Sequence, residues 1–103
     1  MSTEEILKLV QSGTAVGMTR SEVEERLKKM PVTYVYVPRA NLEMTSEQSL
    51  AGKPLSGRFD VLTPHERDLM LMKQAAIYIE LDEQERVVNV RVRAFGFTPK
   101  DGS

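Results

Sequence analysis

The chain has 103 residues, of which 41% are hydrophobic and 28% charged, which is typical of one small globular domain. Fourteen basic against fifteen acidic residues give a net charge of −1, which argues against a general binder of nucleic acids or anionic membranes. The absence of cysteine excludes disulfides, thiol nucleophiles and thiolate metal sites, and a single histidine leaves little material for a metal centre.

The N-terminal segment predicts a short amphipathic helix. Ser2 and Glu5 have the spacing of a capping box, in which each residue bonds the backbone of the other. Gly13 suits a helix end because glycine tolerates the left-handed conformation there. We therefore expect a helix from about Thr3 to Ser12, with one apolar face made of Ile6, Leu9 and Val10.

A second helix is predicted after Thr19, which again has capping-box spacing to Glu22. Pro31 ends this helix because the residue before a proline is pushed out of the helical region. The helix pairs acidic with basic residues four positions apart, and we interpret this charge run as a solvated face rather than a docking face. Its apolar stripe consists of Val23, Leu27 and Met30.

The middle of the chain begins with a strand over Val32–Val37, which is β-branched and aromatic throughout and is followed by Pro38. The glycine- and proline-rich segment Ser49–Gly57 predicts an exposed loop. A threonine–proline–glutamate start predicts a short helix over about Pro64–Lys73, although Leu69–Met72 can instead extend the next strand.

The clearest pattern is an antiparallel hairpin of Ala76–Asp82 and Val87–Phe95, joined by the loop Glu83–Arg86. One face is apolar if Leu81 pairs with Val88, Ile79 with Val90, and Ile77 with Val92. The other face holds the polar set Tyr78, Glu80, Asp82, Asn89, Arg91 and Arg93. Such clean alternation is typical of a sheet with one buried and one wet face.

These elements predict an α+β domain of two layers spanning residues 1–103, with 98–103 as a flexible tail. Two N-terminal helices pack on an antiparallel sheet of at least three strands. The strand that holds Tyr34 and Tyr36 is expected to join the hairpin. A loop and short-helix insert separates that first strand from the second.

The run Gly17–Leu27 reads Gly-Met-Thr-x-x-x-Val-x-x-x-Leu, and it is followed by Pro31 and then by a predicted strand. This segment resembles one found in the SmpA/OmlA (BamE-like) family, whose fold is that of the β-lactamase inhibitor protein. The resemblance implies a non-enzymatic domain that presents its sheet and loops to protein partners. A lipid-attachment cysteine is absent, so the resemblance is used for fold and interaction style rather than for an outer-membrane role.

No catalytic, metal-binding or cofactor-binding residues are expected. His65 stands between a helix-starting proline and a capping glutamate, and no serine or acid is placed to work with it. The acidic hairpin tip lacks the alternating ligands and glycine of a calcium loop. Gly52-Lys53-Pro54 and Gly57-Arg58 do not have the spacing of a phosphate loop.

The candidate site is a face of the sheet rich in tyrosine and arginine, because these residues concentrate binding energy at protein interfaces. Strand parity predicts that the two tyrosines of the first strand share this face with Tyr78, opposite Ile79 and Val90. The alternative is that the insert covers those tyrosines and that the arginines pair with Glu80 and Asp82. The predicted partner-binding residues are Tyr34, Tyr36, Tyr78, Glu80, Arg91 and Arg93.

The sequence thus favours a protein-interaction module, such as an inhibitor, an immunity-type protein or an assembly subunit, that binds through its sheet face or central loop. The alternative is a structural homo-oligomer, for instance a homodimer, joined through the sheet face or an edge strand. An enzyme or small-ligand binder ranks third, and neither a nucleic-acid partner nor a membrane span is expected. The predicted location is the cytoplasm, or the periplasm if an export leader was removed.

Overall fold

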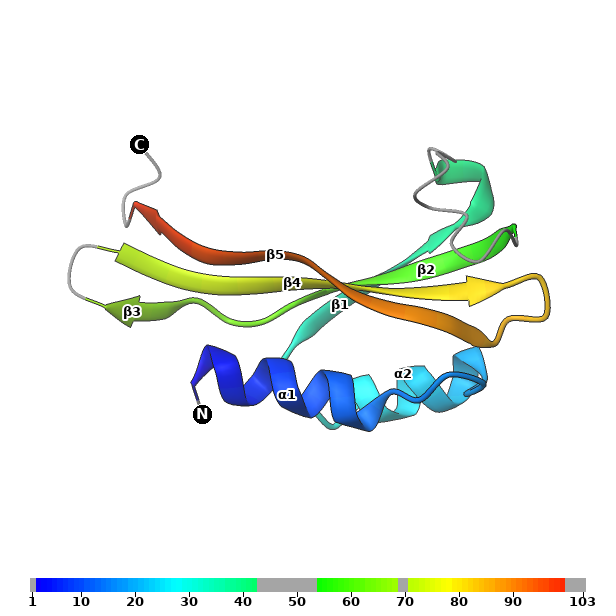
Figure 1. The fold of residues 1–103 in the computed structure, drawn as a ribbon, viewed down its shortest axis with the longest axis horizontal. Coiled ribbons are helices and arrows are strands. Elements are labelled where there is room, and N and C mark those ends of the chain that lie inside the picture. The colour runs from blue at the N-terminus through cyan, green and yellow to red at the C-terminus, as the bar shows by residue number, and fades with distance from the viewer. Residues whose placement is uncertain (1, 43–53, 69–70, 100–103) are drawn as a thin grey trace.

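Two helices lie against one face of a twisted antiparallel sheet, which confirms the predicted α+β architecture of two layers (Figure 1). The structure is a computed structural model that describes residues 2–42, 54–68 and 71–99. In the described residues the sheet has five strands. The helices precede the strands in the chain, as expected.

Both helices begin at the predicted capping boxes. Helix α1 spans Thr3–Gly13, and the Ser2 hydroxyl accepts a hydrogen bond from the Glu5 N–H at 3.2 Å. Helix α2 spans Arg20–Lys28, where Thr19 and Glu22 make the same reciprocal contact. These local bonds satisfy backbone donors that the first helical turn leaves unpaired, so they fix where each helix starts.

The strands form a sheet in the order β1, β2, β4, β5. The short β3 pairs with the same edge of β4 as β2 does, but β3 pairs with the start of β4 and β2 with its end. All neighbouring strands are antiparallel. A short 3₁₀ helix, Arg39–Asn41, follows β1. The strands are β1 (Thr33–Pro38), β2 (Leu55–Leu62), β3 (Glu66–Asp68), β4 (Leu71–Asp82) and β5 (Val87–Pro99).

The hairpin of β4 and β5 has the predicted turn and nearly the predicted register. Ile79 pairs with Val90 and Ile77 with Val92, as expected. Leu81 pairs with Val87 rather than Val88, because an irregularity in the ladder adds one residue to β5 there. The strand continues to Pro99, so the part of the predicted tail at 98–99 belongs to the sheet, and 100–103 lie outside the described residues.

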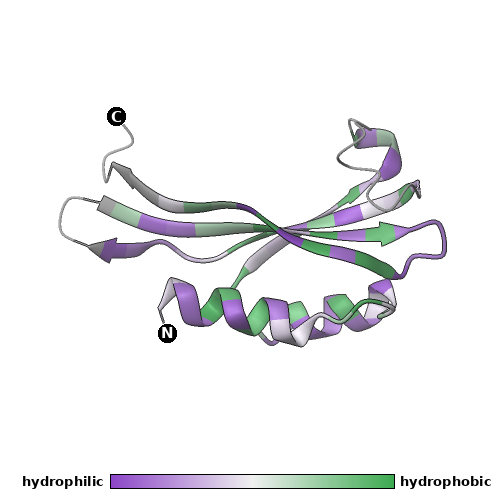
Figure 2. Ribbon diagram, viewed as in Figure 1, coloured by the Kyte–Doolittle hydropathy of each residue, from purple (hydrophilic) through white to green (hydrophobic). Residues whose placement is uncertain are grey.

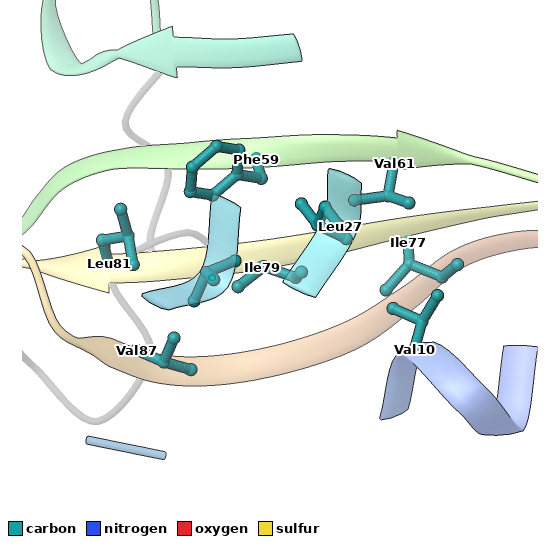
Figure 3. Close-up of a cluster of buried hydrophobic side chains, with 9 residues drawn as sticks. Val10, Leu27, Phe59, Val61, Ile77, Ile79, Leu81 and Val87 are labelled. Atoms are coloured by element: carbon teal, nitrogen blue, oxygen red, sulfur yellow. The ribbon is translucent and has the colours of Figure 1, made fainter. Parts of the chain in front are cut away.

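The core lies between the sheet and the two helices (Figure 3). Apolar residues alternate with polar ones along the strands, so only one face of the sheet supplies this core (Figure 2). Helices α1 and α2 contribute Val10 and Leu27, which point toward the sheet (Figure 3). The buried cluster consists of Val10, Val23, Leu27, Phe59, Val61, Ile77, Ile79, Leu81 and Val87.

The predicted helix over Pro64–Lys73 is wrong. Thr63, expected as its cap, instead bonds to β4: its N–H donates to the Ala75 carbonyl at 3.0 Å, and its hydroxyl accepts from the Ala75 N–H at 2.9 Å. These bonds hold the chain extended, and strand β3 (Glu66–Asp68) follows. The alternative interpretation was that Leu69–Met72 extend the next strand. It holds from Leu71 onward, and residues 69–70 lie outside the described part of the chain.

The insert between the first strand and the hairpin is therefore part of the sheet rather than only a loop and a helix. Within the predicted loop Ser49–Gly57, residues 49–53 lie outside the described part, and Leu55 begins strand β2. Strand β2 alternates buried with half-buried positions and ends at the exposed Leu62. It lies between β1 and the hairpin, so the first strand joins the sheet through β2 and does not pair with the hairpin itself.

Candidate functional site

The two helices leave one face of the sheet uncovered, here called the open face (Figure 1). By the register of the ladder, this face carries the polar side chains of the hairpin. Residues that pair across antiparallel strands share a face. Arg58 pairs with Glu80, and Asp60 pairs with Tyr78 and with Val35 of β1. The open face is therefore built from Val35, Arg58, Asp60, Leu62, Tyr78, Glu80, Asn89, Arg91 and Arg93.

Tyr34 and Tyr36 do not belong to this face, and their predicted place beside Tyr78 is wrong. They pair with Val61 and Phe59, whose side chains face the helices. Both tyrosine rings meet the Phe59 ring edge-on, with centroids 6.0 and 5.4 Å apart. Strand parity requires only that Tyr34 and Tyr36 share a face, and their register with β2 turns both rings toward the core.

Tyr36 is further held by helix α2. The Arg20 guanidinium stacks 3.6 Å above the centre of its ring. The two tyrosines are thus half-buried parts of the packing between sheet and helices, and not free binding groups.

Tyr78 is the centre of the open face. Arg58, from β2, stacks over its ring at 3.8 Å, and Arg91 and Arg93, from β5, approach the ring centre to 5.0 and 5.5 Å. A guanidinium over an aromatic ring is attracted by the negative face of the ring. Tyr78 therefore lies among three cationic side chains.

Two carboxylates on this face are paired with arginines. The Asp60 carboxylate accepts hydrogen bonds from Arg58 Nε at 2.6 Å and from its Nη2 at 3.4 Å. Burial lowers the pKa of Arg58, but its hydrogen bond and charge attraction to Asp60 outweigh that cost, and the pKa is raised overall. Arg58 therefore stays charged and fixed in place.

Glu80 is fully buried, although it lies on the open face. Its Oε1 accepts a hydrogen bond from the Asn89 amide at 2.9 Å and lies 3.4 Å from Arg91 Nε. Arg91 Nε makes no hydrogen bond to any residue that the structure describes, so its contact with Glu80 is a charge interaction rather than an aligned bond. The alternative interpretation, that the arginines pair with Glu80, thus holds for Arg91. Asp82 instead accepts backbone N–H groups of the hairpin turn.

Arg93 differs from its two neighbours. It is exposed and forms no ion pair with any carboxylate in the described part of the chain. It borders a shallow hollow of about 390 Å³ on the open face, which Asp60 and Tyr78 also line. Val35 and Leu62, which are 58% and 41% exposed, supply apolar surface there. Their contribution was missed because β2 was not predicted, although its alternation was present in the sequence.

His65 is the only histidine of the chain and the only candidate for acid–base chemistry near neutral pH. His65 is exposed in the connection between β2 and β3. No group of three or more histidine, cysteine, aspartate and glutamate side chains in residues 2–42, 54–68 and 71–99 is arranged to hold a metal ion. Among the helices that the structure describes, none is long and apolar enough to cross a membrane.

Comparison with family models, with curated proteins and with solved structures finds no match for this chain.

Proposed function

We propose that the protein is a non-enzymatic interaction module that binds a protein partner through its open face. The observation that carries the proposal is the hollow at Tyr78, which combines exposed apolar side chains with the cation of Arg93, for which the described part of the chain offers no ion-pair partner. Tyrosine and arginine are enriched among the residues that dominate binding energy, and surrounding apolar groups exclude water from them. Of the residues first predicted, Tyr78, Glu80, Arg91 and Arg93 lie on this face, and Tyr34 and Tyr36 do not.

The arrangement of the charges suits binding rather than catalysis. Arg58 and Arg91 are held by Asp60 and Glu80, so they order Tyr78 before a partner arrives. An ordered aromatic side chain loses less conformational entropy on binding than a mobile one. Arg93 remains available to pair with an acidic group of the partner.

Site-specific photo-cross-linking tests this function. A photoreactive amino acid at Leu62 on the open face is compared with one at Glu25, an exposed position on helix α2. We expect a discrete heterologous cross-link in cells of the source organism from position 62 and none from position 25. Equal labelling from both positions, or none from position 62, contradicts the proposal.

The partner identified by the cross-link is then purified, and its affinity for variants of the protein gives the energetic test. Arg93→Ala should weaken binding by about 1 kcal/mol or more, roughly fivefold, whereas Glu25→Ala should leave the dissociation constant unchanged. A homo-oligomer, the alternative function, would instead give cross-links between two copies of the chain and a doubled mass in light scattering.

The type of interaction protein, its family and its location in the cell are also proposals. An inhibitor, an immunity-type protein and an assembly subunit would all use such a face, and the identity of the partner separates them. Membership of the BamE-like family is proposed from the segment Gly17–Leu27 and from the order of helices and strands. A cytoplasmic or, after removal of a leader, periplasmic location is likewise a prediction.

A further inference from the structure

Strand β5 forms one edge of the sheet and is 13 residues long. Its outer side is already used at one end. The Gly17 N–H donates to the Val87 carbonyl, and the Val87 N–H donates to the Met18 carbonyl, each at 2.8 Å. Among the described residues, no backbone group pairs with the outer side of β5 beyond Val87. The linker between the helices thus covers only the start of this edge.

The direction of the backbone N–H and C=O groups on β5 follows from the pairing of β5 with β4. Ala75 of β4 directs its N–H and C=O away from β5, toward Thr63. Backbone direction alternates along a strand, so Ile77 and Ile79 point the same way. Their partners on β5, Val92 and Val90, are then in the non-hydrogen-bonded positions of the β4–β5 ladder. The N–H and C=O groups of Val90 and Val92 therefore point outward.

The stretch Asn89–Val92 of β5 pairs regularly with β4. The ladder between β4 and β5 is irregular on either side of it, but the four pairs from Asn89 to Val92 follow without a shift. Irregularities and charges on an edge strand commonly discourage pairing with other chains. Here the irregularities flank the outward-facing groups of Val90 and Val92 rather than interrupting them.

The two sides of this edge differ in chemistry. On the helix-facing side, Val92 and Phe95 are 38% and 45% exposed, although they are large apolar residues. Lys73 of β4 lies with its Nζ 5.2 Å from the centre of the Phe95 ring, and its charge is paired with Glu4. On the open face stand Arg91 and Arg93, and β5 contains no acidic residue. A strand placed beside β5 would therefore meet apolar surface on one side and positive charge on the other.

We propose that an extended segment of the protein partner adds to the edge of β5, with apolar side chains against Val92 and Phe95 and acidic side chains toward Arg93. This inference rests on the proposed function, because it describes how the partner reaches the open face. Main-chain hydrogen bonds supply affinity in strand addition, and the alternating side chains supply specificity. The segment is therefore one in which aspartate or glutamate alternates with apolar residues.

The charges of β5 also argue against a second copy of this chain as the occupant. Antiparallel self-pairing of β5 around the regular stretch would bring arginines of both copies onto one face, and like charges at opposed positions are destabilising. The other edge of the sheet is less suitable. Strand β1 has only six residues and ends at Pro38, which has no N–H to donate.

The test uses two short synthetic peptides, one alternating valine with glutamate and the other alternating valine with lysine. Each is titrated into the isotope-labelled protein and followed by NMR. We expect the glutamate peptide to bind at least about tenfold more tightly than the lysine peptide, and to slow amide exchange at Val90 and Val92. Absence of binding, equal affinity, or unchanged exchange at β5 overturns the inference.

Variants separate backbone pairing from charge. Val92→Pro removes one outward N–H without removing a bond to β4 and should weaken binding about tenfold, whereas Val92→Thr keeps the N–H and should bind as the parent does. If the proline variant does not fold, Arg93→Glu is decisive. It removes no described ion pair and should reverse the preference toward the lysine peptide. An unchanged preference contradicts the inference.

This experiment can fail while the proposed function stands. If the peptide changes NMR chemical shifts only at Val35 and Leu62, and position 62 still gives a cross-link, the partner binds at the hollow and strand addition is refuted. If position 62 gives no cross-link and neither peptide binds, both the proposed function and strand addition are refuted.

Discussion

The Tyr36 ring lies across Gly57 of the neighbouring strand and leaves no room for a side chain there. A Cβ at position 57 would stand 2.7 Å from Tyr36 Cζ and 2.8 Å from the Val37 carbonyl oxygen. The glycine thus allows the first strand to fold an aromatic ring against Phe59 at the edge of the core. Gly57 therefore has a packing role.

Gly57→Ala should destabilise the protein by about 1–3 kcal/mol, because the added methyl group meets a ring and a backbone oxygen that cannot both move away. Chemical denaturation monitored by circular dichroism measures the change. Gly96→Ala is the control, since a Cβ at position 96 meets no atom of the described residues within 4 Å. Equal stability of the two variants would show that Tyr36 does not occupy this position.

Features set by neighbouring residues could be predicted from the sequence. The capping boxes at Ser2 and Thr19 depend on contacts three residues apart, and the alternation of the hairpin fixes its register over Ile77 and Ile79. Thr63 shows the limit of such reasoning. Its threonine–proline start suits a helix locally, but bonds to Ala75, twelve residues away, hold it extended.

The candidate site was predictable only in part, for a related reason. Tyr78, Arg91 and Arg93 belong to the hairpin, so alternation alone places them on one face. The faces of Tyr34 and Tyr36 depend on their register with β2, a strand interrupted in sequence by glycine and charged residues. Their orientation could not be derived before β2 was identified.

Leu27 tests whether helix α2 is a structural part of the core. Its side chain is almost fully buried against the sheet, and Leu27→Ala should cost about 2–5 kcal/mol through lost burial and the cavity left behind. Thermal unfolding measures the loss. Glu25→Ala, on the exposed side of the same helix, should change stability by less than about 0.5 kcal/mol. A similarly small effect at Leu27 would remove α2 from the core.

Arg91 has a structural role that Arg93 lacks. Arg91→Ala leaves the buried carboxylate of Glu80 without its cation and should destabilise the protein by about 1–3 kcal/mol. Arg93→Ala should stay within about 0.5 kcal/mol of the parent, which makes it the cleaner probe of binding. Urea unfolding compares the two.

A double variant identifies why Arg91→Ala destabilises the protein. Glu80→Gln combined with Arg91→Ala should be more stable than Arg91→Ala alone, because the buried group that remains is then neutral. If adding Glu80→Gln only increases the destabilisation, the interaction between the two charges is not what stabilises this face.

The capping box of α2 predicts a loss of stability in acid. The Thr19 backbone N–H and hydroxyl bond the Glu22 carboxylate and hold its pKa below the ordinary value of 4.5. A carboxyl whose pKa is lowered by folding stabilises the folded state above its unfolded pKa, and this contribution disappears as the pH falls through the folded pKa. Glu22→Gln should therefore be less stable than the parent near neutrality, and the difference should shrink below about pH 4.5. Unfolding curves recorded from neutral to acidic pH test this, with Glu25→Gln, which takes no part in the cap, as the control. A difference between parent and Glu22→Gln that stays constant over this range would show that the charge of Glu22 does not stabilise the helix.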